Sequence, residues 1–240
     1  MSDLLEDTTV LVPMNAADPV EPPPALVELL HPHRVVVLGY YPVPDQASPE
    51  QLQAEHGETA AETVENAAEH FATSEGTVES LIVFTRDRQT TIDRIADEYD
   101  CDAVLSGGSM GEQLNRVFIP LKGDANLERI VTFVSALLAD TDAEVTLFNV
   151  VDSDDEASAG EFLLRGAADR LAEDGIDRGR IEWTQERARS PAPAIVSAAS
   201  DADLIVVGES EPTLRGRILG DVTDRIMSES SHPLLVVRTL

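Results

Sequence analysis

The run Asp201-Ala-Asp-Leu-Ile-Val-Val-Gly208 indicates the fold of this chain. Its branched apolar residues stand between a pair of aspartates and a glycine, a composition typical of a strand buried on both faces of a sheet. A similar run, Asp100-Cys-Asp-Ala-Val-Leu-Ser-Gly107, lies 101 residues earlier, counted between the two glycines. Two shorter runs, Thr9-Val-Leu-Val-Pro-Met-Asn15 and Val117-Phe-Ile-Pro-Leu-Lys122, have their prolines 107 residues apart. These similar offsets predict a duplicated unit.

Apolar strands and stretches of helical period alternate within each predicted repeat. The first repeat predicts strands at 9–15, 34–40, 80–84 and 102–106, with helices at 49–72 and 91–99. The second predicts strands at 117–120, 144–151, 180–185, 203–207 and 233–238, helices at 127–138, 161–172, 194–199 and 221–230, and a surface loop at 152–158. This alternation predicts an α/β fold with parallel sheets covered on both faces. Since the first repeat lacks the last helix and strand, we expect a truncated domain at 1–112 and a complete domain at 113–240.

The charge of the chain is strongly negative. Its 240 residues include 45 Asp and Glu against 17 Lys and Arg, which gives a formal net charge of −28. Such a field repels phosphate backbones and anionic lipids, so the composition argues against nucleic-acid and membrane-surface binding. The acidic residues are spread along the whole chain, and only one cation is a lysine. We therefore expect a soluble protein of a salt-rich cytoplasm, as in a halophilic archaeon, where screening weakens self-repulsion.

Other sequence features exclude several classes of site. The single cysteine, Cys101, excludes an internal disulfide and a Cys-rich metal site, and it is expected to be a core thiol. The acidic segment 1–9 does not resemble a signal peptide, and no apolar run approaches the ~20 residues that cross a bilayer. None of the five histidines forms a helical pair with metal-ligand spacing.

Three stretches carry a family resemblance: Ile119-Pro-Leu-Lys122, the run ending at Gly208, and the closing segment Gly220-Asp-Val-Thr-Asp-Arg-Ile226 with Ser230-Ser-His-Pro-Leu-Leu-Val-Val-Arg238. On these marks the second repeat resembles the universal stress protein family over its full length, and the first resembles a truncated copy. The resemblance implies two Rossmann-like open parallel sheets of the adenine nucleotide alpha hydrolase-like type, with strand order 3-2-1-4-5 in the second domain. In such sheets ligands bind beyond the carboxyl ends of the strands where the order reverses, here between the first and fourth strands.

The resemblance also implies how ATP-binding members hold phosphate. A Gly-x-x-Gly turn follows strand four, and nine residues later a Gly followed by Ser or Thr begins the last helix, where backbone N–H groups approach the anion. In this sequence Gly208 keeps the first glycine, but Glu211 replaces the second and Asp221 replaces the hydroxyl residue. The spacing to Gly220 is also one residue shorter. We therefore expect a degenerate nucleotide pocket.

The candidate nucleotide or anion crevice comprises residues from both sides of this reversal point: Lys122, Gly123, Gly208, Arg215, Gly216, Gly220, Asp221 and Val222. Lys122 stands where ATP-binding members usually carry an acidic residue, and a lone ammonium there suits an anionic ligand. It is alternatively a solvated loop lysine, or it neutralises nearby carboxylates across an empty crevice. Asp221 also suits the N-cap of the last helix, and Arg215 also suits a surface ion pair.

The first repeat gives weaker indications of a ligand. Asn15 occupies its strand-one position, and Gly107-Gly-Ser-Met-Gly111 follows its fourth strand. Ser106-Gly-Gly-Ser109 is superficially similar to the phosphate loop of N-type ATP pyrophosphatases, but that loop follows a first strand. A flexible turn between the repeats explains these glycines better. The sequence has no Walker-type loop, dinucleotide fingerprint or serine-nucleophile elbow, so no catalytic residue is predicted.

The sequence thus favours a non-enzymatic stress-response or regulatory binding protein that needs no cofactor or metal. It would act through an unknown protein partner or as a homodimer that pairs through the last strand, Leu234 to Arg238. An adenine-nucleotide switch that binds ATP with Mg²⁺ in the second-domain crevice is the alternative. A slow ATP hydrolase is a third hypothesis, and the sequence favours it least.

Overall fold

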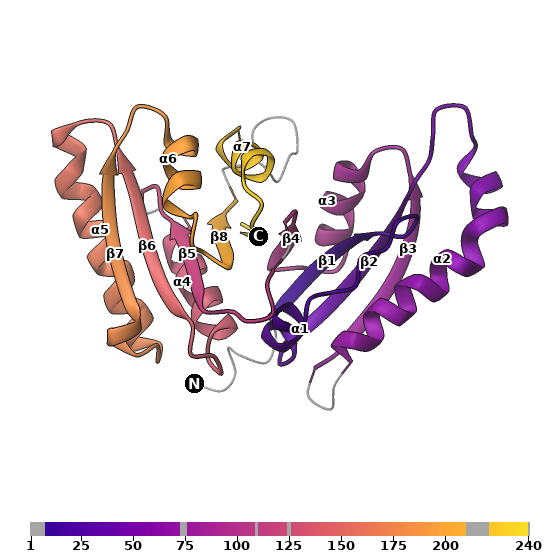
Figure 1. Ribbon diagram of the computed structural model, residues 1–240, viewed down its shortest axis with the longest axis horizontal. Helices are drawn as coiled ribbons and strands as arrows, with labels where there is room; N and C mark the ends of the chain where they lie inside the picture. The colour runs from indigo at the N-terminus through magenta and orange to yellow at the C-terminus, as the bar shows by residue number, and fades with distance from the viewer. Residues whose placement is uncertain (1–7, 73–75, 109, 124–125, 210–220, 240) are drawn as a thin grey trace. The chain divides into compact units, whose positions relative to one another are not determined.

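The strands and helices of the computed structural model form two compact units, Met1–Leu105 and Ser106–Thr239. The structure describes residues 8–72, 76–108, 110–123, 126–209 and 221–239. The predicted α/β class is confirmed, because within each unit parallel strands alternate with helices (Figure 1). Among the described residues, no helix combines the length and the apolar character needed to cross a membrane.

The first unit consists of a parallel sheet and three helices. Its elements in chain order are β1 (Thr9–Asn15), α1 (Pro24–Leu30), β2 (Arg34–Pro42), α2 (Pro49–Phe71), β3 (Val78–Thr85), α3 (Arg88–Glu98) and β4 (Ala103–Ser106). Strand β1 pairs with β2 on one side and with β4 on the other, and β2 pairs with β3. Helix α2 packs on β2 and β3 and contacts α1 (Figure 1). Strand β3 is therefore the outer strand on the side of β2.

The second unit repeats this arrangement and extends it by one helix and one strand. Its elements are β5 (Arg116–Pro120), α4 (Leu127–Leu137), β6 (Glu144–Val151), α5 (Asp154–Glu173), a 3₁₀ turn (Arg178–Arg180), β7 (Ile181–Arg187), α6 (Pro191–Ala198), β8 (Leu204–Gly208), α7 (Asp221–Glu229) and β9 (Leu234–Val237). Strand β5 pairs with β6 and β8, β6 pairs with β7, and β8 pairs with β9, all in parallel. Helix α4 packs against α5, and α6 packs against α7.

One prediction about local structure was wrong, and one short helix was not predicted. The segment 152–158 is not a loop throughout, because α5 begins at Asp154. Acidic residues are favourable in the first turn of a helix, where they interact with the helix dipole, so a charged stretch does not exclude a helix. Helix α1 was missed because it has only seven residues. Four of them are buried: Ala25, Leu26, Leu29 and Leu30. Cys101 is fully buried, which confirms the core thiol.

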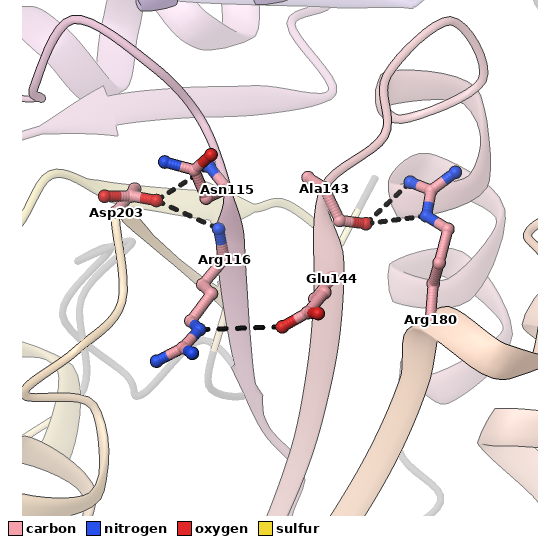
Figure 2. A network of polar contacts seen from close by, with 6 residues as sticks. All are labelled: Asn115, Arg116, Ala143, Glu144, Arg180 and Asp203. Carbon is pink, nitrogen blue, oxygen red and sulfur yellow. Dashed lines mark hydrogen bonds and ion pairs between the residues drawn. The ribbon is translucent and has the colours of Figure 1, made fainter.

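The amino edge of the second sheet is held together by one aspartate. Figure 2 shows that Oδ2 of Asp203 accepts the backbone N–H groups of Asn115 at 2.7 Å and Arg116 at 2.9 Å. The backbone N–H of Asp203 donates in return to the carbonyl of Arg116 at 2.9 Å. The carboxylate thus fixes the start of β5 beside the start of β8, and it satisfies two amides that the sheet itself does not pair.

Two arginines connect the same edge to the neighbouring strands (Figure 2). Nε of Arg116 lies 3.6 Å from the carboxylate of Glu144 on β6. The guanidinium of Arg180 donates twice to the carbonyl of Ala143, from Nε at 3.0 Å and from Nη2 at 2.6 Å. The amino edge is therefore stabilised by structural polar contacts.

The first unit uses an equivalent aspartate. Oδ2 of Asp102 accepts the backbone N–H of Thr9 at 2.9 Å, and the N–H of Asp102 donates to the carbonyl of Thr9 at 2.8 Å. Asp102 and Asp203 are the second aspartates of the two similar runs that indicated the repeat. The similarity of these runs therefore has a structural cause, since each aspartate anchors the first strand of its unit.

Candidate functional site

The carboxyl end of β5 positions the only lysine of the chain. Leu121 precedes it, and its backbone is fixed on both sides: its N–H donates to the carbonyl of Phe148 at 2.7 Å, and its carbonyl accepts Nδ2 of Asn149 at 2.8 Å. Lys122 follows with an exposed side chain, and Gly123 then turns the chain with φ +71°. Because this φ lies in the left-handed region, glycine suits the turn. An exposed ammonium thus follows a hydrogen-bonded backbone at the end of the first strand of this unit.

A buried amide network supports this backbone. Asn149 is 5% exposed, and its Oδ1 accepts Nε2 of Gln185 at 3.2 Å. The same Nε2 also donates to the carbonyl of Ala157 at 3.1 Å. A Cβ atom at Gly160 would lie 2.2 Å from Oδ1 of Asn149, so a larger residue there would displace the side-chain ends that form the network. These residues could not be singled out from the sequence, because Asn149 and Gln185 come from separate strands and no local motif connects them.

The carboxyl end of β8 is covered by the segment that follows β5. Asn126 has φ 62°, and its Nδ2 donates to the carbonyl of Glu209 at 3.1 Å. Ile130 packs over Gly208, where a Cβ atom would lie 2.7 Å from its Cδ1 atom. The start of α4 therefore lies against the first glycine of the predicted phosphate turn.

Glu209 is a further acidic residue that sequence analysis did not single out. Its side chain is buried, and Oε2 accepts the backbone N–H of Thr239 at 2.7 Å and its hydroxyl at 2.9 Å. The backbone N–H of Glu209 donates to the carbonyl of Val237 at 2.7 Å. This N–H is therefore used within the sheet and is not available to a phosphate. The position of Glu209 directly after the strand-ending glycine was the available sequence signal.

The predicted site residues fall into three groups. Lys122, Gly123 and Gly208 lie at the carboxyl ends of the neighbouring strands β5 and β8. Asp221 and Val222 form the start of α7, where Val222 is half-buried. The loop residues Arg215, Gly216 and Gly220, together with Glu211, lie outside the described residues.

The glycine-rich turn after β4 differs from its sequence interpretation. Gly107 and Gly108 both have positive φ, 61° and 64°. A Cβ atom at Gly108 would lie 2.2 Å from the carbonyl carbon of His232, which precedes β9. The hydroxyl of Ser106 lies 3.5 Å from the sulfur of Met227 on α7. Close packing against backbone therefore requires glycine at position 108, a reason that the sequence interpretation did not include, and the flexibility of the turn stays a prediction.

The described residues show few arrangements with catalytic potential. They contain no group of three or more His, Cys, Asp or Glu side chains placed to hold a metal ion. The hydroxyl of Ser230 lies 3.1 Å from Nδ1 of His232, but it also accepts the backbone N–H of His232 at 3.1 Å. This contact is a local turn before β9 of the kind that serine commonly forms.

The geometry defines an α/β protein in which candidate site residues of the second unit lie at the carboxyl ends of its first and fourth strands, β5 and β8. A family model described as the universal stress protein family matches residues 113–238. The chain belongs to the universal stress protein family. No curated relative matches the sequence.

Several solved structures resemble this chain. A universal stress protein from Archaeoglobus fulgidus DSM 4304 is 15% identical with a TM-score of 0.68, over 98% of each chain. A putative universal stress protein from Pseudomonas aeruginosa UCBPP-PA14 is 12% identical with a TM-score of 0.57, over 98% of this chain and 94% of that one. A universal stress protein in complex with cAMP is 26% identical with a TM-score of 0.44, over 53% of this chain and 98% of that one. The first two similarities support the fold.

Proposed function

We propose that this chain is a non-enzymatic regulatory binding protein of the stress response whose second-unit nucleotide pocket is degenerate. The observation that carries the proposal is the contact of α4 with the end of β8. Asn126 bonds the carbonyl of Glu209, and Ile130 covers Gly208. In ATP-binding members of the family this turn brings backbone N–H groups to the phosphates. Here its first N–H is bonded within the sheet and its first side chain is a carboxylate.

Charge supports the same proposal. Glu209 is buried beside the turn, and Glu211 and Asp221 follow it in the sequence. Carboxylates close to a polyphosphate repel it unless a cation lies between them. Two candidate cations oppose these carboxylates, the exposed Lys122 and, in the sequence between Glu211 and Asp221, Arg215. Because the carboxylate of Glu209 is buried at the turn itself, we infer that the site does not bind a triphosphate tightly.

The proposal includes the wider setting predicted from the sequence. We propose a tandem arrangement with a truncated first domain, a cytoplasmic location in a salt-rich and halophilic cell, an absence of catalysis, and a protein partner. The pairing of two chains through Leu234 to Arg238 stays a prediction.

The alternative is an adenine-nucleotide switch. It is favoured by one specific observation, the exposed Lys122 on a backbone that Asn149 and Phe148 fix. A cation that follows a hydrogen-bonded strand end loses less backbone freedom on binding an anion than one on a mobile loop does.

Calorimetric titration of the purified full chain with ATP, with and without Mg²⁺ in molar KCl, separates these two functions. Mass spectrometry of the same preparation identifies any co-purified nucleotide. We expect no heat above dilution and no bound nucleotide. Lys122→Ala tests the crevice, and Arg189→Ala is the matched control, since it removes an exposed cation that follows β7 instead. Micromolar binding that weakens about tenfold or more in Lys122→Ala, but not in Arg189→Ala, would establish the switch instead.

A further inference from the structure

The outer strand of the first unit has one edge without a partner among the described residues. Strand β3 pairs with β2 and with no other strand. Val35 N–H donates to the carbonyl of Thr77, and Val43 N–H donates to the carbonyl of Thr85. In a parallel ladder, alternate residues bond to the same neighbour, so the odd-numbered residues of β3 bond to β2. The N–H and C=O groups of the even-numbered residues, Val78, Ser80, Ile82 and Phe84, therefore point away from β2.

This edge lacks the usual devices that prevent strand association. Native edges are protected by lysine, proline, bulges or inward charges. Strand β3 has the sequence VESLIVFT, whose only charged residue is Glu79. Arg34 neutralises that carboxylate through a bond of 2.6 Å from Nη2, and the bond raises the pKa of the guanidinium above its ordinary value. The edge is thus neutral in a chain of net charge −28.

The outer strand of the second unit provides a contrast. Strand β7 also pairs with one strand only among the described residues. Its seven positions include the charged residues Glu182, Glu186 and Arg187. The guanidinium of Arg165 also lies over the ring of Trp183, at 5.8 Å from its centroid. Like-charged copies of this strand repel each other, whereas copies of β3 do not.

We propose that β3 pairs antiparallel with β3 of a second copy of this chain, with a two-fold axis between the two Leu81 residues. In this register Val78 faces Phe84 and Ser80 faces Ile82, so every outward-pointing residue meets another one. Glu79 faces Val83, and no two like charges are directly opposite. The strand is thus complementary to itself along its whole length, which is what a two-fold interface requires.

The same symmetry predicts a dependence on salt. A two-fold axis between antiparallel strands of one sheet is perpendicular to it, so both copies of α2 lie on the same face. Six exposed glutamates and no lysine or arginine belong to α2: Glu50, Glu55, Glu58, Glu62, Glu65 and Glu69. Repulsion between the two helices weakens as salt screens it. The dimer therefore forms in molar KCl and dissociates at low salt.

Sedimentation velocity of the full chain in 2 M and 0.1 M KCl tests the pairing. We expect a dimer in the first buffer and a larger monomer fraction in the second. Ser80→Pro removes an N–H that points outward and leaves the bonds to β2 intact, whereas Ser80→Thr keeps that N–H. The proline variant should weaken the dimer by about 100-fold or more, and the threonine variant should not.

Cysteine cross-linking tests the register independently of proline. Leu81→Cys places two thiols directly opposite each other at a non-hydrogen-bonded pair, where Cβ atoms lie ~4.5–5.5 Å apart. Val83→Cys places its two thiols four residues apart along the strands. We expect the first variant to form the intermolecular disulfide at least about tenfold faster, because the reaction needs thiols within reach. The native Cys101 is buried and is present in both variants, so it does not affect the comparison between them.

Three results overturn the proposal. If the chain is monomeric in 2 M KCl at a chain concentration of 100 µM, no second copy occupies the edge of β3. A dimer that persists in Ser80→Pro lies on another surface, such as Leu234 to Arg238. A different protein that co-purifies with the chain and is released by Ser80→Pro makes that protein the occupant of the edge.

Discussion

Replacing Asp203 by alanine should destabilise the second unit, because one carboxylate oxygen holds two backbone amides. Oδ2 accepts the N–H of Asn115 at 2.7 Å and of Arg116 at 2.9 Å. Hydrogen bonds to a charged group contribute ~1.5–3 kcal/mol each, and partial exposure of Asp203 places these two at the lower end. Asp203→Ala should therefore lower the free energy of unfolding by about 3 kcal/mol. Asp203→Asn retains one oxygen that accepts both amides, so the loss should be about 1 kcal/mol.

Urea unfolding followed by the fluorescence of Trp183 measures this effect. Trp183 is the only tryptophan of the chain and lies in β7, so it reports on the second unit. Asp201→Ala is the matched control, since Asp201 is exposed and begins the same sequence run. It should change the unfolding free energy by less than about 0.5 kcal/mol. Equal losses in the alanine variants of Asp203 and Asp201 would refute the anchoring role.

Three further substitutions test other parts of the structure. Gly160→Ala should lower the unfolding free energy by about 2 kcal/mol or more in the same urea assay, because its Cβ atom would lie 2.2 Å from Oδ1 of the buried Asn149. Gly108→Ala should lower the melting temperature by several degrees in a calorimetric scan, since the new atom meets the backbone of His232 at 2.2 Å and φ is positive. Glu62→Arg should raise the melting temperature in 0.1 M KCl, because it relieves repulsion along α2, and the gain should shrink in 2 M KCl.

Each of these substitutions has a matched control. Gly166→Ala lies on the same helix as Gly160 and has open space around its Cβ position, so it should stabilise the helix slightly. Gly111→Ala also has open space and should be nearly neutral. Glu62→Gln should give part of the gain of Glu62→Arg at low salt. A gain that is equal at both salt concentrations would contradict the electrostatic explanation.

The sequence predicted the strands better than the helices for a physical reason. A strand buried on both faces is a continuous apolar run, and the runs ending at Ser106 and Gly208 have this composition. Helix α1 is short and follows a proline-rich segment, so its seven residues give only about two helical turns, too few for the period to stand out. The start of α5 carries charges that resemble a loop but suit the first turn of a helix.

The candidate site could be predicted only in part. The positions of Lys122 and Gly208 followed from the rule that ligands bind at the carboxyl ends of parallel strands. The bond between Asn126 and Glu209 joins residues 83 positions apart, and the bond between Glu209 and Thr239 joins residues 30 positions apart. Such contacts depend on the final packing of α4 and β9, which no local pattern encodes.

Polar residues make different contacts at the amino edges and the carboxyl edge of the sheets, and this difference bears on function. At the amino edges, Asp102 and Asp203 make equivalent bonds in both units, so the repeat is preserved where the contacts are structural. At the carboxyl edge of the second unit, Glu209 follows the fourth strand, and its buried side chain is bonded to Thr239. Because ligands of such sheets bind at the carboxyl edge, a change of ligand requires changes there and leaves the amino edge intact. A unit of this fold can therefore lose nucleotide binding and keep its strands paired, as the proposed function requires.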